Sequence, residues 1–225
     1  MRALGRLEGD SYHALLKRLL TDPALFSRHV VGRPLRPYQL EPARAILDSV
    51  LHRRGLTFTV MMARQAGKNE LSAQLELFLL NLFQRAGGNI VKCAPTFRPQ
   101  IVNSKLRLEQ VLNNPWNRGR WGSSYGYMVT LGKAAVMFFS ADESANVMGA
   151  TAHLLLEVDE AQDVSREKYA KEFRPMGATT NVTTVLYGTS WTADTLLEEQ
   201  KRQNLALEAR DGVRRHFQYD WRQVA

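Results

Sequence analysis

A glycine–lysine pair follows a short turn between an apolar segment and a helical pattern. The apolar, strand-like segment is residues 56–62, the turn ends in Gly67 and Lys68, and residues 71–82 repeat apolar side chains at helical spacing. The backbone N–H groups of such a turn and the N-terminus of the next helix point at an anion, and the lysine adds a positive charge. The arrangement is typical of a phosphate-binding loop.

The loop departs from the common phosphate-loop pattern at two positions. The pattern has a glycine five residues before Gly67, where this chain has Met62, and it has Ser or Thr after the lysine, where this chain has Asn69. On these residues alone, a helix whose Lys68 only caps a surface explains the sequence equally well. Other motifs have to decide between the two interpretations.

Two adjacent carboxylates, Asp159 and Glu160, end a second apolar segment at residues 153–158. In an open α/β sheet, ligands bind at the C-terminal ends of the strands. One carboxylate can hold a magnesium shell while the next activates a water, and in-line attack on a γ-phosphate needs both tasks. The alternative is a solvated pair at the start of a loop. The apolar segment and the glycine–lysine turn upstream favour the catalytic interpretation.

Two further motifs are weaker when taken alone. Residues 188–190 (Gly-Thr-Ser) follow an apolar segment at 182–187; small hydroxyl residues there can report the state of a γ-phosphate, but they are also common in turns. Tyr38 and Gln39 lie upstream of the loop. A glutamine amide pairs with a donor and an acceptor on adenine, and a tyrosine ring stacks on a base. The same two residues could simply begin a helix.

Apolar segments alternate with helical patterns along the chain. We expect helices over residues 12–20, 23–29, 38–52, 68–84, 99–112, 166–173 and 193–209, and strands over residues 56–62, 89–94, 127–131, 134–140, 153–158, 182–187 and 213–219. We expect residues 113–126, rich in Asn, Gly and Arg, to form a loop. The alternation predicts an α/β domain with a mainly parallel sheet and right-handed crossovers.

Composition sets broad limits on the protein. A length of 225 residues suits one large domain, and the net charge of +8 with a pI near 9.8 favours a polyanionic partner. No apolar run approaches the roughly 20 residues that span a bilayer, and residues 1–10 do not resemble a secretory signal. The single cysteine, Cys93, excludes an internal disulfide and lies in an expected buried strand, so we interpret it as structural. These features indicate a soluble protein of a reducing interior.

The order of five motifs along the chain resembles the ATPase domain of the large terminase subunit of tailed phages. The motifs are Pro-Tyr-Gln (37–39), Arg-Gln-Ala-Gly-Lys-Asn (64–69), Ala-Pro-Thr (94–96), Asp-Glu-Ala-Gln (159–162) and Gly-Thr-Ser (188–190). The resemblance covers roughly residues 35–209, and the loop looks like a known variant of that family, which accounts for Asn69. It implies a three-layer P-loop NTPase fold of the ASCE/RecA-like kind. It also implies a motor that drives double-stranded DNA into a capsid by ATP hydrolysis.

The resemblance implies a role for each matched residue. Lys68 would contact the β- and γ-phosphates, and Arg64 would lie near the γ-phosphate. Asn69 and Asp159 would hold Mg²⁺, and Glu160 would activate the attacking water. The other implied residues are a loop that wraps the phosphates (Ala63, Arg64, Gln65, Ala66 and Gly67), an adenine site (Tyr38 and Gln39) and a coupling motif (Gly188, Thr189 and Ser190).

The same resemblance implies cofactors, partners and a domain division. The cofactors are ATP and Mg²⁺. The partners are double-stranded DNA, the portal protein, the small terminase subunit and further copies in a ring, usually a pentamer, in the host cell cytoplasm. We expect an N-terminal helical extension over residues 1–34, the ATPase core over 35–210 and a C-terminal strand or linker over 211–225 toward a nuclease domain outside this chain. We expect no nuclease activity from this fragment, and a monomer in isolation.

Two features of the family are left open by the residues. Many relatives carry a trans-acting arginine in a segment like residues 146–152, where this chain has Met148. The other candidates are Arg98, Arg118, Arg120, Arg166 and Arg174. The surface that grips DNA is also open, with one basic cluster as a candidate (Arg210, Arg214, Arg215 and Arg222).

Two alternative functions remain. Asp-Glu-Ala-Gln and Ala-Pro-Thr also resemble motifs of two-domain helicases, which favours a helicase-like, nucleic-acid-dependent ATPase. A nucleotide- or DNA-binding module with a decayed phosphate loop would explain Met62 and Asn69. The presence of Lys68, Asp159 and Glu160 together argues against such decay.

Overall fold

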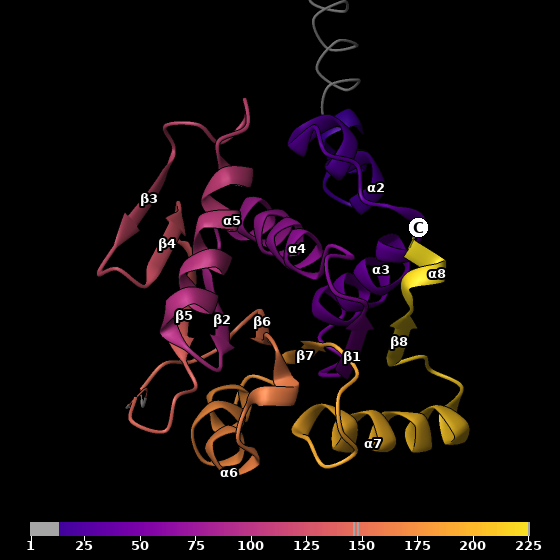
Figure 1. Cartoon of the computed structure of the whole chain (residues 1–225). Helices are drawn as coiled ribbons and strands as arrows, with labels where there is room; N and C mark the ends of the chain where they lie inside the picture. Colours follow the sequence, from indigo (N-terminus) through magenta and orange to yellow (C-terminus); the bar gives the residue numbers. More distant parts are fainter. Residues whose placement is uncertain (1–13, 146, 148, 225) are drawn as a thin grey trace, which may run out of the picture.

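Figure 1 shows the computed structural model of the chain, which describes residues 14–145, 147 and 149–224. One eight-stranded sheet has the order β3-β4-β5-β2-β6-β7-β1-β8. The strands are β1 (Thr57–Met62), β2 (Gly88–Ala94), β3 (Trp121–Ser124), β4 (Met128–Leu131), β5 (Ala134–Ser140), β6 (Leu155–Val158), β7 (Thr183–Gly188) and β8 (His216–Tyr219). The strands from β5 to β8 in this order pair in parallel, while β3, β4 and β5 pair antiparallel. The expected α/β class with a mainly parallel sheet is confirmed.

Helices cover both faces of the sheet, as Figure 1 shows. The longer ones are α3 (Pro37–Leu51), α4 (Lys68–Phe83), α5 (Val102–Leu112) and α7 (Leu196–Asp211). Residues 14–19 are also helical, and three α-helices are short: α2 (Pro23–Phe26), α6 (Arg166–Lys168) and α8 (Trp221–Val224). The π-helical turns are η1 (Ser27–Val31), η2 (Phe97–Ile101) and η4 (Tyr169–Phe173). The 3₁₀ turns are η3 (Ala161–Asp163) and η5 (Arg174–Gly177).

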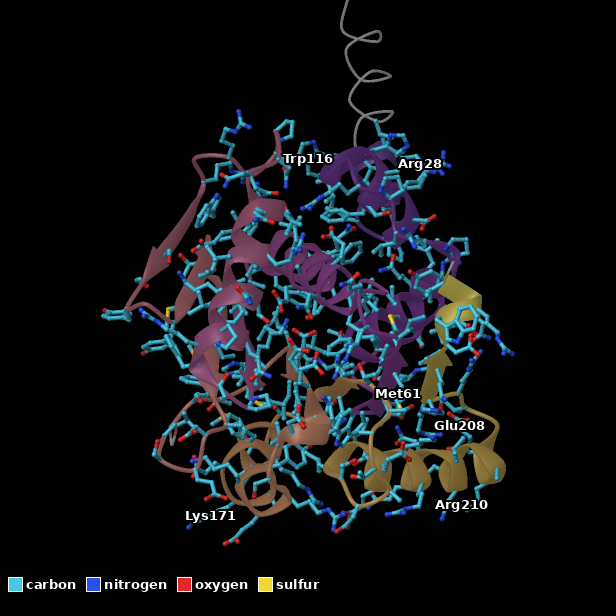
Figure 2. The ribbon with its side chains drawn as sticks, viewed as in Figure 1. Arg28, Met61, Trp116, Lys171, Glu208 and Arg210 are labelled. Atoms are coloured by element: carbon cyan, nitrogen blue, oxygen red, sulfur yellow. The ribbon has the colours of Figure 1, made fainter. Side chains whose placement is uncertain are left out.

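Each face of the sheet has its own hydrophobic core, which makes the three layers. The first core packs α2, α3, α4 and α5 against one face. The second core packs η4, η5 and the start of α7 against the other face and includes Met61 of β1, labelled in Figure 2. Strands β6 and β7 are buried along their whole length, as expected for parallel strands covered on both sides. The predicted three-layer architecture is therefore confirmed.

The prediction of a loop over residues 113–126 is wrong for residues 121–124, which form β3. Gly122, Ser123 and Ser124 have weak strand propensity, so local preference gives little indication of a strand there. Their strand conformation comes from antiparallel pairing with β4, in which Trp121 lies opposite Leu131. The antiparallel edge of the sheet therefore has three strands rather than a simple hairpin.

The remaining differences concern the ends of elements. The helix expected over 166–173 is one short α-helical piece followed by a π-helical and a 3₁₀ turn, and Pro175 lacks the N–H that would continue an α-helix. The last strand is shorter than expected, and α8 follows it unpredicted. Within the described residues, no helix is long and apolar enough to cross a membrane. Residues 1–13 and Met148 lie outside the described part of the chain.

Candidate phosphate-binding and catalytic site

The expected phosphate loop connects the end of β1 to the start of α4. Gly67 has φ +84°, in the left-handed region that favours glycine, and Lys68 is the first residue of α4. A Cβ at Gly67 would lie 2.6 Å from Nε2 of Gln39, so the position also lacks room for a side chain. Met62, which replaces the usual first glycine, is a buried residue of β1. In this chain the strand runs on to Met62, and the turn itself begins at Ala63.

Tyr38 and Gln39 support this loop from α3. The hydroxyl of Tyr38 donates to the carbonyl of Ala66 at 2.9 Å, and Nε2 of Gln39 donates to the carbonyl of Gly67 at 3.0 Å. Oε1 of Gln39 accepts from the backbone N–H of Arg36 at 2.9 Å, and the residue is only 4% exposed. Both functions of the Gln39 amide are thus used inside the protein. The contacts show a bracing role, while the adenine role of this pair stays a prediction.

Lys68 lies between Thr189, in the predicted coupling motif, and Glu160. Its Nζ donates to Oγ1 of Thr189 at 2.9 Å and lies 3.7 Å from Oε1 of Glu160. The Thr189 hydroxyl in turn donates to the carbonyl of Met62 at 3.2 Å. Strand register explains the meeting, because Met61 of β1 pairs with Gly188 of β7 and places the two strand ends side by side. The side chain of Lys68 is 8% exposed and that of Glu160 is 28% exposed, so the pair borders solvent without being fully hydrated.

Gln162 closes these contacts into a ring, which we call the site ring (Lys68, Glu160, Gln162 and Thr189). Its Nε2 donates to Oε2 of Glu160 at 2.7 Å, and its Oε1 accepts from the backbone N–H of Thr189 at 3.3 Å. A Cβ at Gly188 would lie 2.3 Å from the same Oε1, which explains why glycine stands there. We did not predict Gln162 as a site residue, although it ends the Asp-Glu-Ala-Gln motif.

Asp159 and Glu160 have different surroundings. Asp159 is 3% exposed, its Oδ1 accepts from the N–H of Glu160 at 3.0 Å and its Oδ2 accepts from Ser104 of α5 at 3.2 Å. Glu160 has a left-handed backbone with φ +46°, rare for a residue with a side chain. That turn directs its carboxylate to Lys68 and Gln162. The two adjacent carboxylates therefore serve different partners.

A cleft of about 1130 Å³ opens over the loop. Ten of its lining residues are among the predicted site residues: Ala63, Arg64, Gln65, Ala66, Gly67, Lys68, Asn69, Glu160, Thr189 and Ser190. The others were not predicted: Glu70, Gln100, Arg107, Gln162, Asp163 and Trp191. Four predicted site residues do not line it: Tyr38, Gln39, Asp159 and Gly188. The structure thus brings most of the predicted residues to one cleft.

Arg107 is an additional cation of this cleft that the sequence did not single out. It comes from α5, and its Nη1 lies 3.5 Å from Oε2 of Glu70. Arg33 approaches the same carboxylate oxygen at 3.4 Å, and Gln74 donates to the other oxygen. Glu70 therefore keeps two partners if Arg107 turns toward an anion in the cleft.

Metal binding here would depend on few protein ligands. Within the described residues, no group of three or more His, Cys, Asp and Glu side chains is arranged to hold a metal ion. Mg²⁺ is usually bound through one or two carboxylates together with phosphate oxygens and water. Asn69, exposed at the start of α4, and the buried Asp159 fit such a site only with phosphates in the cleft.

A buried charged cluster lies beneath the site and joins three of its elements. We call it the buried cluster (Ser72, Glu76, Lys92 and Glu157). Nζ of Lys92 donates to Ser72 at 2.6 Å and to Glu76 at 3.0 Å, and Ser72 donates to Glu157 at 2.8 Å. Ser72 and Glu76 lie on α4, one and two turns after Lys68, and Glu157 lies two residues before Asp159. The cluster therefore ties the phosphate-loop helix to the strand that carries the carboxylates.

Burial controls the charge of this cluster. Desolvation, together with the nearby Glu76, raises the pKa of Glu157 well above its usual value. Desolvation alone would lower the pKa of Lys92, but the carboxylates of Glu76 and Glu157 outweigh it and raise that pKa. The raised pKa of Lys92 means that this lysine keeps its positive charge at neutral pH. Burial also raises the pKa of the neighbouring Cys93 thiol, consistent with a structural cysteine.

The basic cluster near the C-terminus is not the free cationic surface that we considered. Arg215 is buried and pairs with both carboxylate oxygens of Asp211, at 2.8 and 2.6 Å. Arg214 pairs with Glu41 and lies over the ring of Phe217. Half of the proposed cluster is therefore neutralised within the protein, because acidic residues on α7 and α3 lie next to it.

The structure places three of the candidates for a trans-acting arginine. Arg166 is held in ion pairs with Asp194 and Glu199. Arg118 and Arg120 lie next to β3, at the opposite edge of the sheet from β8. Met148 lies outside the described residues.

A mainly parallel sheet with a glycine–lysine turn between β1 and α4 defines the P-loop NTPase class of fold. No family model matches the sequence, and neither does any curated protein. Solved structures do match. The HK97 bacteriophage large terminase has a TM-score of 0.69 and 19% identity, over 90% of this chain and 43% of that chain.

Two further structures are of the same kind. The ATPase domain of the Thermus phage P74-26 large terminase has a TM-score of 0.61 and 18% identity, over 76% of this chain and 70% of that chain. The large terminase of a thermophilic bacteriophage, in complex with ADP, has a TM-score of 0.62 and 14% identity, over 83% of this chain and 45% of that chain. The chain thus has the fold of large terminase ATPase domains. It spans less than half the length of the HK97 protein and of the ADP-bound protein.

Proposed function

We propose that this chain is the ATPase motor domain of a DNA-packaging machine, coupling Mg-ATP hydrolysis to translocation of double-stranded DNA into a viral capsid. The site ring is the observation that carries the proposal. It joins a phosphate-loop lysine, a glutamate that would activate water and a hydroxyl residue at the end of the neighbouring strand. These are the parts that phosphoryl transfer to water requires.

The loop and α4 would bind the phosphates. The N-terminus of a 16-residue helix presents backbone N–H groups and a partial positive charge to an anion. Lys68 and the exposed Arg64 add full charges at the cleft wall. Such fixed positive groups stabilise the charge that develops on the transferred phosphoryl group. Magnesium, held by Asn69 and Asp159 together with the phosphates, would supply further charge neutralisation.

Glu160 would accept the proton of the attacking water. Gln162 holds one oxygen of its carboxylate at 2.7 Å, which leaves the other oxygen toward the cleft and Lys68. When Lys68 turns to phosphate, its contact with Glu160 has to weaken, while its hydrogen bond to Thr189 has to move with the amine. Thr189 and Gln162 would then pass this change to the segment of Gly188, Thr189 and Ser190. We propose this step as the origin of coupling.

The solved neighbours support this proposal through their fold. The thermophilic phage's large terminase is known in complex with ADP and in complex with ATP-gamma-S, so the fold accommodates a nucleotide in that protein. By analogy we propose that the chain works as a ring of copies with portal protein and small terminase subunit in the host cytoplasm. The division into residues 1–34, 35–210 and 211–225 also stays a prediction.

The direct experiment is a nucleotide titration beside steady-state phosphate release, with Mg²⁺ and with or without duplex DNA. The wild-type chain should bind ATP and release phosphate, and duplex DNA should raise the rate. Lys68→Ala should lose binding, while Lys105→Ala, on α5 and outside the cleft lining, should retain it. A wild-type chain that binds ATP without any phosphate release would instead favour the nucleotide-binding module.

A further inference from the structure

The end of α4 remote from the phosphate loop lies beside a group of exposed cations, which we call the distal patch (Arg85, Arg118, Arg120 and Lys133). All four side chains are exposed. Helix α4 has 16 residues and is therefore about 24 Å long at about 1.5 Å per residue. Lys68 begins this helix and Gln84 caps its other end. One rigid element thus runs from the proposed ATP site to the distal patch.

Gln84 gathers the patch residues at the helix end. Its carbonyl accepts from the backbone N–H of Lys133 at 2.8 Å, and its Oε1 accepts from Nη2 of Arg120 at 2.7 Å. A Cβ at Gly132 would lie 2.4 Å from the Gln84 carbonyl, so the turn between β4 and β5 sits directly on the helix end. Arg85 is the next residue of the chain. Three of the four cationic residues, Arg85, Arg120 and Lys133, therefore lie next to Gln84.

Buried asparagines hold the loop that carries Arg118 and Arg120. Asn117 and Asn81 of α4 exchange amide hydrogen bonds of 2.8 and 3.3 Å, and Asn114 donates to Asn117 at 2.9 Å. All three asparagines are buried. Trp116, labelled in Figure 2, belongs to the same loop. A loop anchored in this way is already ordered, so binding a ligand costs little conformational entropy.

The distal patch has no acidic counterpart among the described residues near it. Residues 110–141 contain neither Asp nor Glu. Across the described part of the chain, the ion pairs include none of the four patch residues. Elsewhere the arginines Arg166, Arg214 and Arg215 are each paired with a carboxylate. Cations at a helix C-terminus also stabilise the helix dipole, but that effect fades beyond the last turn and would be served by Arg85 alone.

The surroundings of the patch suit a phosphodiester backbone. Next to it runs β3, the edge strand, with small exposed residues at Gly122, Ser123 and Ser124. Tyr125 follows and is 80% exposed. Serine and tyrosine hydroxyls and backbone N–H groups are common donors to DNA phosphates, beside Arg and Lys.

We propose that the distal patch binds the backbone of double-stranded DNA. The inference rests on the proposed function for the identity of the polyanion. Because α4 carries Lys68 at one end and touches the patch at the other, a shift of this helix on nucleotide binding would move the DNA contacts. The patch replaces the C-terminal arginines as the gripping surface.

The test compares two double variants with the same change in charge. The patch variant is Arg85→Gln and Lys133→Gln. Arg118 is kept because it is a candidate for the trans-acting arginine, and Arg120 is kept because it also bonds to Gln84. The control is Arg44→Gln and Arg210→Gln, exposed residues of α3 and α7. In Figure 2, Arg210 lies at the opposite end of the view from Trp116. Fluorescence anisotropy with a duplex of about 30 base pairs, long enough to span about three helical turns, measures affinity over a series of NaCl concentrations.

The patch variant should bind duplex DNA at least about tenfold more weakly, and its slope of log K against log[NaCl] should shrink by about 1.8, since each of the two lost phosphate contacts contributes about 0.9. The control should change affinity less than about threefold. Equal losses in both variants would overturn the proposal, as would tighter binding of single-stranded than of duplex DNA. If the double variant does not fold, Lys133→Glu on its exposed turn gives the same comparison against Arg210→Glu.

ATP turnover without DNA separates this inference from the proposed function. The patch variant should keep the basal turnover of the wild type, because neither Arg85 nor Lys133 lines the cleft. If the wild type shows no turnover but the patch variant still loses DNA affinity, the motor assignment fails and the DNA surface stands. If turnover is normal and affinity is unchanged, the surface assignment fails alone.

Discussion

Lys68 and Thr189 are 121 residues apart in the chain, yet Nζ of Lys68 donates to the hydroxyl of Thr189 at 2.9 Å. The same hydroxyl reaches back to the carbonyl of Met62 at the end of β1. One small side chain therefore contacts both ends of the phosphate loop. Through this contact, a movement of Lys68 on phosphate binding would also move Thr189 at the end of β7. Thr189 is therefore a direct target for substitution.

Thr189→Val should keep the fold and reduce ATP turnover. Valine has the shape of threonine but cannot accept from Lys68, so the amine loses one hydrogen bond and its fixed position. A hydrogen bond to a charged group is worth about 1.5–3 kcal/mol, which corresponds to a loss of about tenfold or more in rate. Steady-state phosphate release measures the effect. Thr189→Ser restores the hydroxyl and should recover most of the rate. Wild-type turnover in Thr189→Val would show that the contact does not contribute to hydrolysis.

Gln162 should matter for the rate of hydrolysis more than for nucleotide affinity. Gln162→Ala frees Glu160 and breaks the link to Thr189, so kcat should fall by about tenfold while KM changes less than about threefold. Gln162→Glu should be worse, because a second carboxylate beside Glu160 raises the pKa of the pair. The measurement is the kcat and KM of each variant, together with the pH profile of kcat. A change confined to KM would place Gln162 in nucleotide binding instead.

The buried cluster should contribute strongly to stability. Lys92→Met would leave Glu76 buried without its cation, and breaking a buried ion pair by removing one partner costs about 3–5 kcal/mol. Lys105→Met is the matched control, since Lys105 pairs with Glu109 within one turn of α5 near the surface and should cost less than about 1 kcal/mol. Urea unfolding of the three proteins gives the comparison. Similar losses of unfolding free energy in Lys92→Met and Lys105→Met would mean that the buried carboxyl groups do not depend on Lys92 for stability.

The raised pKa of Glu157 predicts a pH dependence of stability. The folded protein keeps a proton that the unfolded chain releases above about pH 4.5, so this contribution is full below that pH and is lost as the pH rises through the folded pKa. The free energy of unfolding should fall by up to about 1.4 kcal/mol per pH unit in that window. Glu157→Gln has no proton to lose, so its stability should fall less between about pH 5 and about pH 8. Equal falls in the free energy of unfolding with pH in the wild type and in Glu157→Gln would contradict a raised pKa of Glu157.

Much of the fold followed from local patterns in the sequence. The continuous apolar segments before Lys68, Asp159 and Thr189 predicted the three buried strands whose ends meet at the cleft. Strand β3 could not be predicted, since Gly122, Ser123 and Ser124 become a strand only through pairing with β4. Pairing across the sheet, rather than local preference, decides such an edge.

Site residues that belong to a sequence motif could be predicted. Site residues that reach the cleft only through contacts between distant segments could not. Lys68, Glu160 and Thr189 belong to recognisable motifs, and the structure brings them together. Arg107 reaches the cleft only because α5 packs beside α4, which no spacing in the sequence reveals. The C-terminal arginines resemble a basic surface in the sequence because Glu41, the partner of Arg214, lies on α3, and because Arg215 meets Asp211 only through the chain reversal after α7.

The central claim is that Glu160 activates water for hydrolysis of ATP held by Lys68. Steady-state phosphate release by Glu160→Gln, measured beside an ATP titration of the same protein, tests it most directly. The amide keeps the shape and the contact with Gln162 but cannot take a proton. We predict ATP affinity within about threefold of the wild type and a loss of turnover of about 100-fold or more. Unchanged turnover with normal ATP binding would contradict the account.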